Sequence, residues 1–423
     1  MEAKRMSLTG NEAAAWAVRC AKVSVNTSFP MGPNQEVLET VQKFIDKEEV
    51  SNMKAIIPDN EKSAASLQIG ASRIGVRTMH CVNSEGILWA ASEIHYAASS
   101  RLPMLMICPS RALEPPTTVY CDHDDFLVLR DMGWLMFYCE DSQDIFDTIL
   151  QVYKIMEQEK VLLPAIVGYD GWETSHASAR VDIPDQASID AFLPAPDFIK
   201  PEKDYLAVNW KERCSQRRYQ QGVGGPLFMD IRHSQKKAEA DSAIIIEEVG
   251  EEYKKTFNSR HTGLIENHKC EDAELILVTM GIVYPSIKFM VNALRLKGIK
   301  IGCVKIRTLR PFPSAQIIKA VENAKLVVTL DRNSITAIFS ELSVALYSLL
   351  NQKKQPPMLM GKTIGVGGAP ITLDLITNII EEGFENIKQG MVKKEMEWIG
   401  EEGMTVKNFL GVDYDPSRHA LGE

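Results

Sequence analysis

The chain has 423 residues, of which 45% are hydrophobic and 24% charged, a balance typical of a globular protein large enough for two domains. Its formal net charge of -9 and its lack of long basic runs argue against a nucleic-acid-binding surface. No apolar run approaches the roughly 20 residues of a membrane-spanning helix, and the first residues form no apolar signal core, so we expect a cytoplasmic protein without a membrane span.

The first part of the chain alternates helical and strand-like segments. Thr9 and Glu12 form the pattern of a capping box, which predicts a helix that begins near Gly10. Short apolar bursts then recur with helix-length segments between them, and each burst predicts a buried strand: residues 53–57, 77–82, 104–108 and 162–169. This rhythm is typical of a parallel α/β sheet.

A connector and a second α/β pattern follow. Prolines interrupt the chain after about residue 185, and a long charged helix is predicted over residues 236–256. Strands and helices then alternate again with the spacing of βαβ units: residues 275–280, 284–297, 301–306, 314–323 and 326–330. The predicted fold class is therefore α/β, with two parallel-sheet domains at 1–190 and 271–389, a connector at 191–270 and a C-terminal tail at 390–423.

The eight cysteines show no metal-binding pattern. No two of them lie closer than 13 positions apart, so the chain has no Cys-x-x-Cys motif. This spacing predicts neither an iron–sulfur cluster nor a structural zinc site on this chain. Scattered thiols of this kind fit a reducing compartment, in which most act as small buried apolar groups.

Short motifs of small, charged and aromatic residues recur along both halves of the chain. In the first half they are Thr9–Ala13, Phe29–Asn34, Glu61–Ala64, Asn83–Gly86, Ser110–Leu113, Asp122–Asp125 and Tyr169–Trp172. In the second half they are Thr279–Gly281, Arg310–Pro313, Leu330–Arg332 and Gly365–Gly368. Over roughly residues 7 to 385, their order resembles that of the alpha subunit of the pyruvate:ferredoxin oxidoreductase family, the 2-oxoacid:acceptor oxidoreductases. Each motif is weak alone, but so many in one order are a strong signal.

The resemblance implies a reaction and a set of cofactors. It implies a thiamine-pyrimidine-binding domain followed by a domain like the transketolase C-terminal domain. The reaction would be the oxidative decarboxylation of a 2-oxo acid with CoA, giving an acyl-CoA and carbon dioxide. Thiamine diphosphate would be shared with a beta-type partner subunit that carries Mg²⁺, the diphosphate site and a [4Fe-4S] cluster. Gamma-type and ferredoxin-like subunits would complete the complex, with ferredoxin or a NAD-reducing flavin subunit as acceptor.

The resemblance assigns Glu61 to the thiamine pyrimidine. Thiamine enzymes need a carboxyl group against N1′ of this ring, because the hydrogen bond favours the tautomer that removes the reactive proton. Residues Pro30, Ser84, Glu85 and Gly86 are assigned to cofactor binding on the same basis. The plain alternative for Glu61 is an acid that only balances the dipole at a helix start.

Arg111 is the residue proposed to bind the substrate carboxylate. Its guanidinium offers a planar fork of donors, and it follows a predicted strand, where ligands of α/β sheets usually bind. The alternative is a surface arginine that caps a loop. Asp122 and His123 are expected in a hydrogen-bonding loop near the substrate rather than at a metal, and we expect no metal ligand on this chain.

The metal-binding half of a thiamine site is missing from the sequence. Thiamine enzymes usually hold the diphosphate metal with a Gly-Asp-Gly element and a later asparagine. This chain has only Asp170 and Gly171 after a tyrosine, and the next asparagine is Asn209. A complete thiamine decarboxylase on one chain is therefore disfavoured, and the cofactor is expected to lie across a subunit interface.

Gly32 is the departure that bears on the substrate. It stands where pyruvate-using relatives carry a threonine whose hydroxyl meets the substrate. The loss of that side chain favours a bulkier 2-oxo acid, such as phenylglyoxylate. Two alternatives remain: the glycine only relaxes a turn while another group such as Asn34 replaces the hydroxyl in a pyruvate pocket, or the chain is a noncatalytic scaffold subunit.

Overall fold

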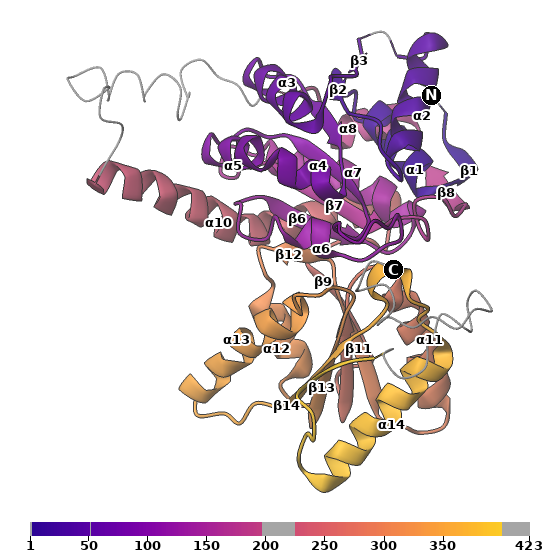
Figure 1. The fold of residues 1–423 in the computed structure, drawn as a ribbon, viewed down its shortest axis with the longest axis vertical. Helices are drawn as coiled ribbons and strands as arrows, with labels where there is room; N and C mark the ends of the chain where they lie inside the picture. Colours follow the sequence, from indigo (N-terminus) through magenta and orange to yellow (C-terminus); the bar gives the residue numbers. More distant parts are fainter. Residues whose placement is uncertain (1, 51, 197–224, 400–423) are drawn as a thin grey trace, which may run out of the picture.

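The computed structural model describes residues 2–50, 52–196 and 225–399, and these residues form two α/β units (Figure 1). The fold class expected from the sequence is thereby confirmed. Residues 197–224 of the connector, which include Asn209, and the tail beyond residue 399 lie outside the described residues. None of the helices in the described ranges combines the length and the apolar composition needed to cross a membrane.

The first unit is built on a seven-stranded sheet. Its strands are β2 (Val25–Thr27), β3 (Lys54–Ile56), β4 (Thr78–Cys81), β5 (Leu105–Ser110), β6 (Leu135–Cys139), β7 (Ala165–Asp170) and β12 (Thr308–Arg310). They run in the order β12-β6-β7-β5-β4-β2-β3. Every pair is parallel except β12 with β6. The loops that follow the parallel strands therefore meet along one edge of the sheet. A separate antiparallel pair joins β1 (Lys4–Leu8) to β8 (Ala179–Ile183).

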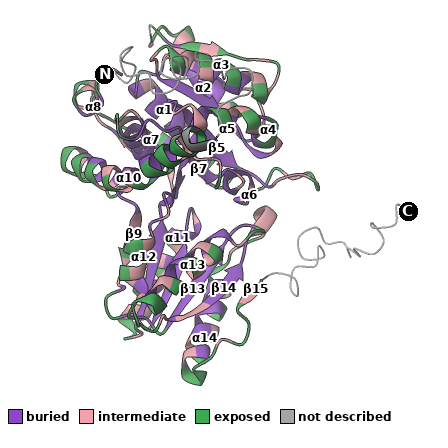
Figure 2. Cartoon of the chain, turned by 90° about the vertical axis from the view of Figure 1, so that its left-hand side faces the viewer, coloured by how far each residue is buried: buried purple, intermediate pink, exposed green. Residues whose placement is uncertain are grey.

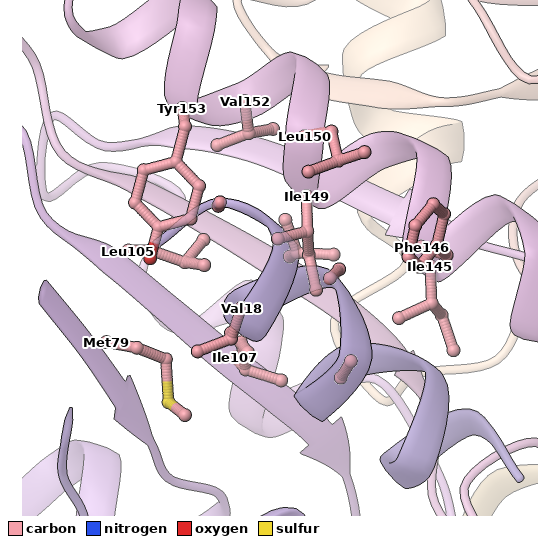
Figure 3. Close-up of a cluster of buried hydrophobic side chains, with 14 of the residues drawn as sticks. Val18, Met79, Leu105, Ile107, Ile145, Phe146, Ile149, Leu150, Val152 and Tyr153 are labelled. Atoms are coloured by element: carbon pink, nitrogen blue, oxygen red, sulfur yellow. The ribbon is translucent and has the colours of Figure 1, made fainter. Parts of the chain in front are cut away.

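Helices cover both faces of this sheet, and the strands alternate their side chains between the two layers. One layer contains α1 (Gly10–Cys20), α2 (Gln35–Asp46) and α7 (Ser142–Met156). The other contains α3 (Glu61–Arg73), α4 (Ser84–Trp89), α5 (Ala91–Ser99) and α6 (Asp124–Leu127). Leu105 and Ile107 pack into the first layer (Figure 3). Met106 and Cys108 pack into the second. The predicted capping box at Thr9 and Glu12 is present at the start of α1.

Two helices connect the units. These are α8 (Gln186–Phe192) and α10 (Gly225–Phe257), a helix that begins earlier than the predicted residue 236. Near its end, the hydroxyl of Tyr253 donates to Asp147 of α7 at 2.8 Å. The connector is thus anchored on the α7 layer of the first unit.

The second unit has a six-stranded sheet in the order β15-β14-β13-β10-β11-β9. Its strands are β9 (Ile265–His268), β10 (Leu275–Thr279), β11 (Ile301–Ile306), β13 (Leu326–Asp331), β14 (Met358–Thr363) and β15 (Met396–Trp398). Its helices are α11 (Val283–Leu296), α12 (Ser314–Val321), α13 (Ala337–Asn351) and α14 (Leu373–Gln389). Buried residues follow the strands, and exposed ones gather on the outer helix surfaces (Figure 2). Strand β15 lies within the stretch assigned to the tail, and the buried Lys362 binds its Glu397 at 2.7 Å.

Two buried ionic clusters and a shared strand join the units. Strand β12 comes from the second half of the chain but completes the first sheet. Beside it, Lys305 lies 3.1 Å from Glu140 and 3.5 Å from Asp144 of the first unit. At the end of β7, Arg332 donates to Asp170 at 2.8 Å. Breaking one partner of a buried ion pair leaves a charge without compensation, which usually costs several kcal/mol.

We expect Arg332→Met to lower the free energy of unfolding by about 3 to 5 kcal/mol, because Asp170 would lose its buried counter-charge. Arg180→Met is the matched control, since Arg180 pairs with Asp182 at the surface and its side chain is 63% exposed. That change should leave the free energy of unfolding nearly unchanged, because an exposed ion pair contributes little. Urea unfolding of the two purified variants measures both values, and equal losses would contradict a special role for the buried pair.

Candidate active site

The predicted site residues gather at the carboxyl edge of the first sheet. Gly32 follows β2, Ser84 follows β4 and Arg111 follows β5 directly. Glu61 begins α3, which follows β3. The parallel strands bring these positions to one edge although they are far apart in the sequence.

Glu61 lies in a buried cradle that Gly86 shapes. Glu61 is the first residue of α3 and follows the N-cap residue Asn60. The side chain of Asn60 accepts a hydrogen bond from the Ser63 N–H at 2.9 Å. Glu61 is only 2% exposed, and its Oε1 atom has no hydrogen-bond partner. A Cβ at Gly86 would lie 2.7 Å from Cγ of Glu61 and 2.8 Å from Oε1. An acid that only balanced the helix dipole would need neither burial nor this clearance, so the geometry favours a ligand-binding carboxylate.

Ser84 and Glu85 form the wall next to this cradle. Ser84 has φ of 48°, a left-handed conformation that costs energy for a residue with a side chain. Its Oγ lies 2.8 Å from the carbonyl oxygen of Ala112 and 2.7 Å from Oε2 of Glu85. Partial burial opposes the charge of Glu85, but hydrogen bonds from Ser84 and from the backbone of Glu114 hold its pKa below the ordinary value.

Arg111 is buried between acids. Its Nη2 lies 3.4 Å from Oε2 of Glu85 and 3.3 Å from Oε1 of Glu114, and its Nε is buried with no partner. The contact with Glu114 fits a role in holding the loop after β5. The unpartnered Nε fits a second role, because a buried donor without an acceptor is rare unless a ligand supplies one.

Asp125 was only part of a predicted acidic loop, but it links the elements of the site. Its Oδ2 accepts from the backbone N–H of Ser84 at 2.9 Å and from that of Arg111 at 3.0 Å. Its Oδ1 accepts from the Phe126 N–H at 2.7 Å. Burial raises the pKa of Asp125 to about 7 against the opposing effect of these donors. The sequence signal was the Asp122–Asp125 motif, which did not show which acid faces which loop.

The loop after β2 leaves open space at Gly32. A Cβ built there would meet nothing within 4 Å, and Gly32 does not have a left-handed φ. The backbone therefore does not require a glycine at this position. Asn34 is buried, and its side chain accepts from the Met31 N–H at 3.0 Å and donates to the Cys81 carbonyl at 3.3 Å. Because Asn34 holds the loop in this way, it is poorly placed to replace a missing hydroxyl. Pro30 is exposed at the rim.

His123 and Asp122 are buried toward the second unit. His123 Nε2 lies 3.0 Å from Oδ1 of Asp170, and its ring packs on Tyr138 with centroids 4.4 Å apart. Burial raises the pKa of Asp122 to about 6, and this carboxylate accepts from the Asp124 N–H. The described contacts of His123 thus belong to the network that joins the units.

The described residues fit a thiamine pyrimidine but not the metal that holds the diphosphate. Glu61 and Gly86 supply a buried free carboxylate oxygen and clearance beside it. The Asp-Gly pair at Asp170 is already engaged, because its carboxylate accepts from Arg332, from the Ile282 N–H at 3.1 Å and contacts His123. Cys121 lies 3.2 Å from the same carboxylate, but the Arg332 guanidinium at 2.8 Å already balances its charge, which disfavours a second cation.

Comparisons with known proteins identify the family to which this chain is similar. Residues 16–251 match the family model described as pyruvate flavodoxin/ferredoxin oxidoreductase, thiamine diP-bdg, and residues 273–376 match pyruvate:ferredoxin oxidoreductase core domain II. A solved 2-oxoglutarate:ferredoxin oxidoreductase from Magnetococcus marinus has TM-score 0.68 at 16% identity. That alignment covers 90% of this chain and 65% of the other. A split-gene transketolase has TM-score 0.52 at 11% identity, with 90% and 99% covered.

The fold is that of the two-domain α/β thiamine enzymes. The pyruvate synthase subunit PorA of Pyrococcus furiosus is 32% identical over 94% of this chain and 98% of its own length. The ketoisovalerate oxidoreductase subunit VorA of Pyrococcus horikoshii is 30% identical over 92% and 96%. The chain belongs to the thiamine-diphosphate-binding pyruvate flavodoxin/ferredoxin oxidoreductase family, as an alpha-type subunit of a 2-oxoacid oxidoreductase.

We expect Gly86→Ala to lower activity of the assembled enzyme about 100-fold, because the added methyl group would displace the Glu61 carboxylate. Gly70→Ala in α3 is the matched control, since a Cβ there meets nothing within 4 Å. The control should keep full activity and gain up to about 1 kcal/mol of stability. CoA-dependent dye reduction with saturating thiamine diphosphate measures both, and equal activities would contradict the cradle.

Proposed function

We propose that this chain binds the pyrimidine end of thiamine diphosphate and the carboxylate of a 2-oxo acid within an oxidoreductase complex. The buried Glu61 carboxylate with its free Oε1, cleared by Gly86, is the observation that carries this assignment. When bound, thiamine diphosphate supplies the nucleophilic carbon and accepts the electron pair that decarboxylation releases. Glu61 would hold a proton against N1′ of the pyrimidine, and burial keeps water from competing for that hydrogen bond.

Arg111 is proposed to orient the substrate. Its buried Nε has no partner on this chain, and the carboxylate of a 2-oxo acid would supply the missing acceptor. Glu85 and Glu114 already lie near its Nη2. They would hold the guanidinium in place and reduce its net attraction for an anion. A carboxylate that is bound but not strongly stabilised is suited to leave as carbon dioxide.

The rest of the cofactor site is proposed to come from a partner subunit. The carboxylate of Asp170 is engaged in the interdomain network, so Mg²⁺ and the diphosphate need other ligands. Exposed apolar side chains on and around α3, α4 and α5 offer a docking face beside Glu61: Ile57, Leu67, Ile74, Leu88, Trp89 and Tyr96. A beta-type subunit that carries a [4Fe-4S] cluster would cover this face, with gamma-type and ferredoxin-like subunits beyond it. CoA would be the co-substrate, and ferredoxin or a NAD-reducing flavin subunit the acceptor.

The open space at Gly32 supports a substrate larger than pyruvate. Its backbone conformation does not require glycine, so the missing side chain leaves volume that an aryl or branched group can fill. Phenylglyoxylate is the aryl acid that we propose. Pyruvate is the second candidate, because several similar relatives are pyruvate synthase subunits.

We expect Glu61→Gln to lower turnover of the co-purified complex at least about 100-fold, since a neutral amide cannot hold the proton as the carboxyl does. Glu39→Gln, at an exposed position of α2, is the control and should leave turnover unchanged. Anaerobic, CoA-dependent dye reduction measures the effect. Full activity of the Glu61→Gln variant would favour a noncatalytic scaffold, and turnover by the isolated chain would contradict the shared site.

We expect Gly32→Thr to shift the substrate preference toward pyruvate. The ratio of kcat/KM for phenylglyoxylate over pyruvate should fall roughly 10- to 100-fold, because added atoms fill the space of the larger group. Gly32→Ala separates added volume from the added hydroxyl. If the unchanged enzyme already prefers pyruvate at matched concentrations, the large-substrate proposal fails.

A further inference from the structure

Asp125 holds two separate loops of the site with a single carboxylate oxygen. Its side chain is fully buried, and Oδ2 accepts from the backbone N–H of Ser84 and from that of Arg111 at 2.9 and 3.0 Å. These two residues follow neighbouring strands, β4 and β5, and are not bonded to each other through their backbones. The other oxygen, Oδ1, is fixed by the Phe126 N–H. The carboxylate therefore has little freedom to rotate.

The bond to Ser84 stabilises a strained backbone. Ser84 has φ of 48°, and such a strained conformation persists only where several surrounding contacts hold it. Asp125 fixes its N–H, while its Oγ lies 2.8 Å from the Ala112 carbonyl. Ser84 starts the short helix α4, whose Gly86 lies against Glu61. If the strained backbone of Ser84 relaxed, Gly86 would move. Gly86 lies too close to the Glu61 side chain to move without displacing it.

The bond to Arg111 acts at the other end of the site. It fixes the backbone of Arg111 where β5 ends, and therefore the origin of the guanidinium. Glu85, which follows Ser84, contacts that same guanidinium. Ser84 and Arg111 are thus joined twice, once through the buried carboxylate and once through side chains at the surface of the site.

We propose that Asp125 is a positioning residue that sets the Glu61 cradle and Arg111 in register with each other. It touches neither cofactor nor substrate. The inference rests on the proposed roles of Glu61 and Arg111, and it adds that one buried acid controls both. Loss of the shared acceptor should therefore impair cofactor activation and substrate binding together.

The test compares Asp125→Asn and Asp125→Ala in the co-purified complex, with Asp131→Asn as the exposed control in the same segment. An asparagine keeps one acceptor oxygen and turns its amide N–H₂ toward a backbone donor. We expect a roughly tenfold fall in kcat/KM for the oxo acid, the factor that one lost net hydrogen bond gives. Alanine removes every acceptor, and we expect a fall of about 100-fold. The control should match the unchanged enzyme.

Two readouts separate positioning from a purely structural role. We expect a higher KM for the oxo acid, which reports Arg111, and a weaker near-ultraviolet circular dichroism band of bound thiamine diphosphate, which reports the Glu61 side. Both changes should occur in complexes of unchanged size. If Asp125→Asn lowers only the unfolding temperature and leaves KM and the band unchanged, the proposal is overturned. This outcome for Asp125→Asn overturns the proposal even if Asp125→Ala fails to fold. If Glu61→Gln also leaves activity unchanged, the proposed function itself fails.

Discussion

The buried pair of Asp170 and Arg332 sets how the two α/β units meet, and the composition of the active site depends on it. Burial alone would raise the pKa of Asp170, but His123 and then Arg332 hold it well below the ordinary value. The carboxylate is therefore charged, and it is already bound within the protein. It terminates β7 at the carboxyl edge of the first sheet. Because this acid is bound by Arg332, His123 and the Ile282 N–H, its oxygens are not free for a metal ion, which supports the proposal that the metal site lies on a partner subunit.

Some buried side chains at this edge of the sheet are fully hydrogen-bonded within the protein, and others keep a polar atom without a partner. Asn34 and Asp125 are buried with their carbonyl or backbone partners close by. Glu61, Arg111 and His123 are also buried but keep atoms without a hydrogen-bond partner, Oε1, Nε and Nδ1. A buried polar atom without a partner is costly in a finished fold, which is why the free atoms of Glu61 and Arg111 support the proposal that a ligand completes their bonding. Glu61 and Arg111, the two residues that family resemblance assigns to chemistry, are among the residues that keep such atoms.

Much of the fold follows from local pattern, and less of the site does. Strand β11 has the predicted bounds, and the capping box of α1 is visible from Thr9 and Glu12 alone. Strand β2 has only three residues and is held by its neighbours, so no period could mark it. Asp125 shows the limit for the site. Its Oδ2 accepts from two N–H groups in loops that only the folded sheet brings together. Nothing in the Asp122–Asp125 motif distinguishes one acid from the next.

Two glycines of the site have opposite physical meanings. Gly86 is required by packing, because any Cβ would enter the space of the Glu61 side chain. Gly32 is required neither by packing nor by its φ, because it faces open space in an ordinary backbone conformation. A side chain can therefore change at Gly32 without disturbing Glu61, while Gly86 cannot change without doing so. On the proposed roles, a change at Gly32 would alter the substrate pocket and leave the Glu61 cradle unchanged, so that one scaffold would serve 2-oxo acids of different size.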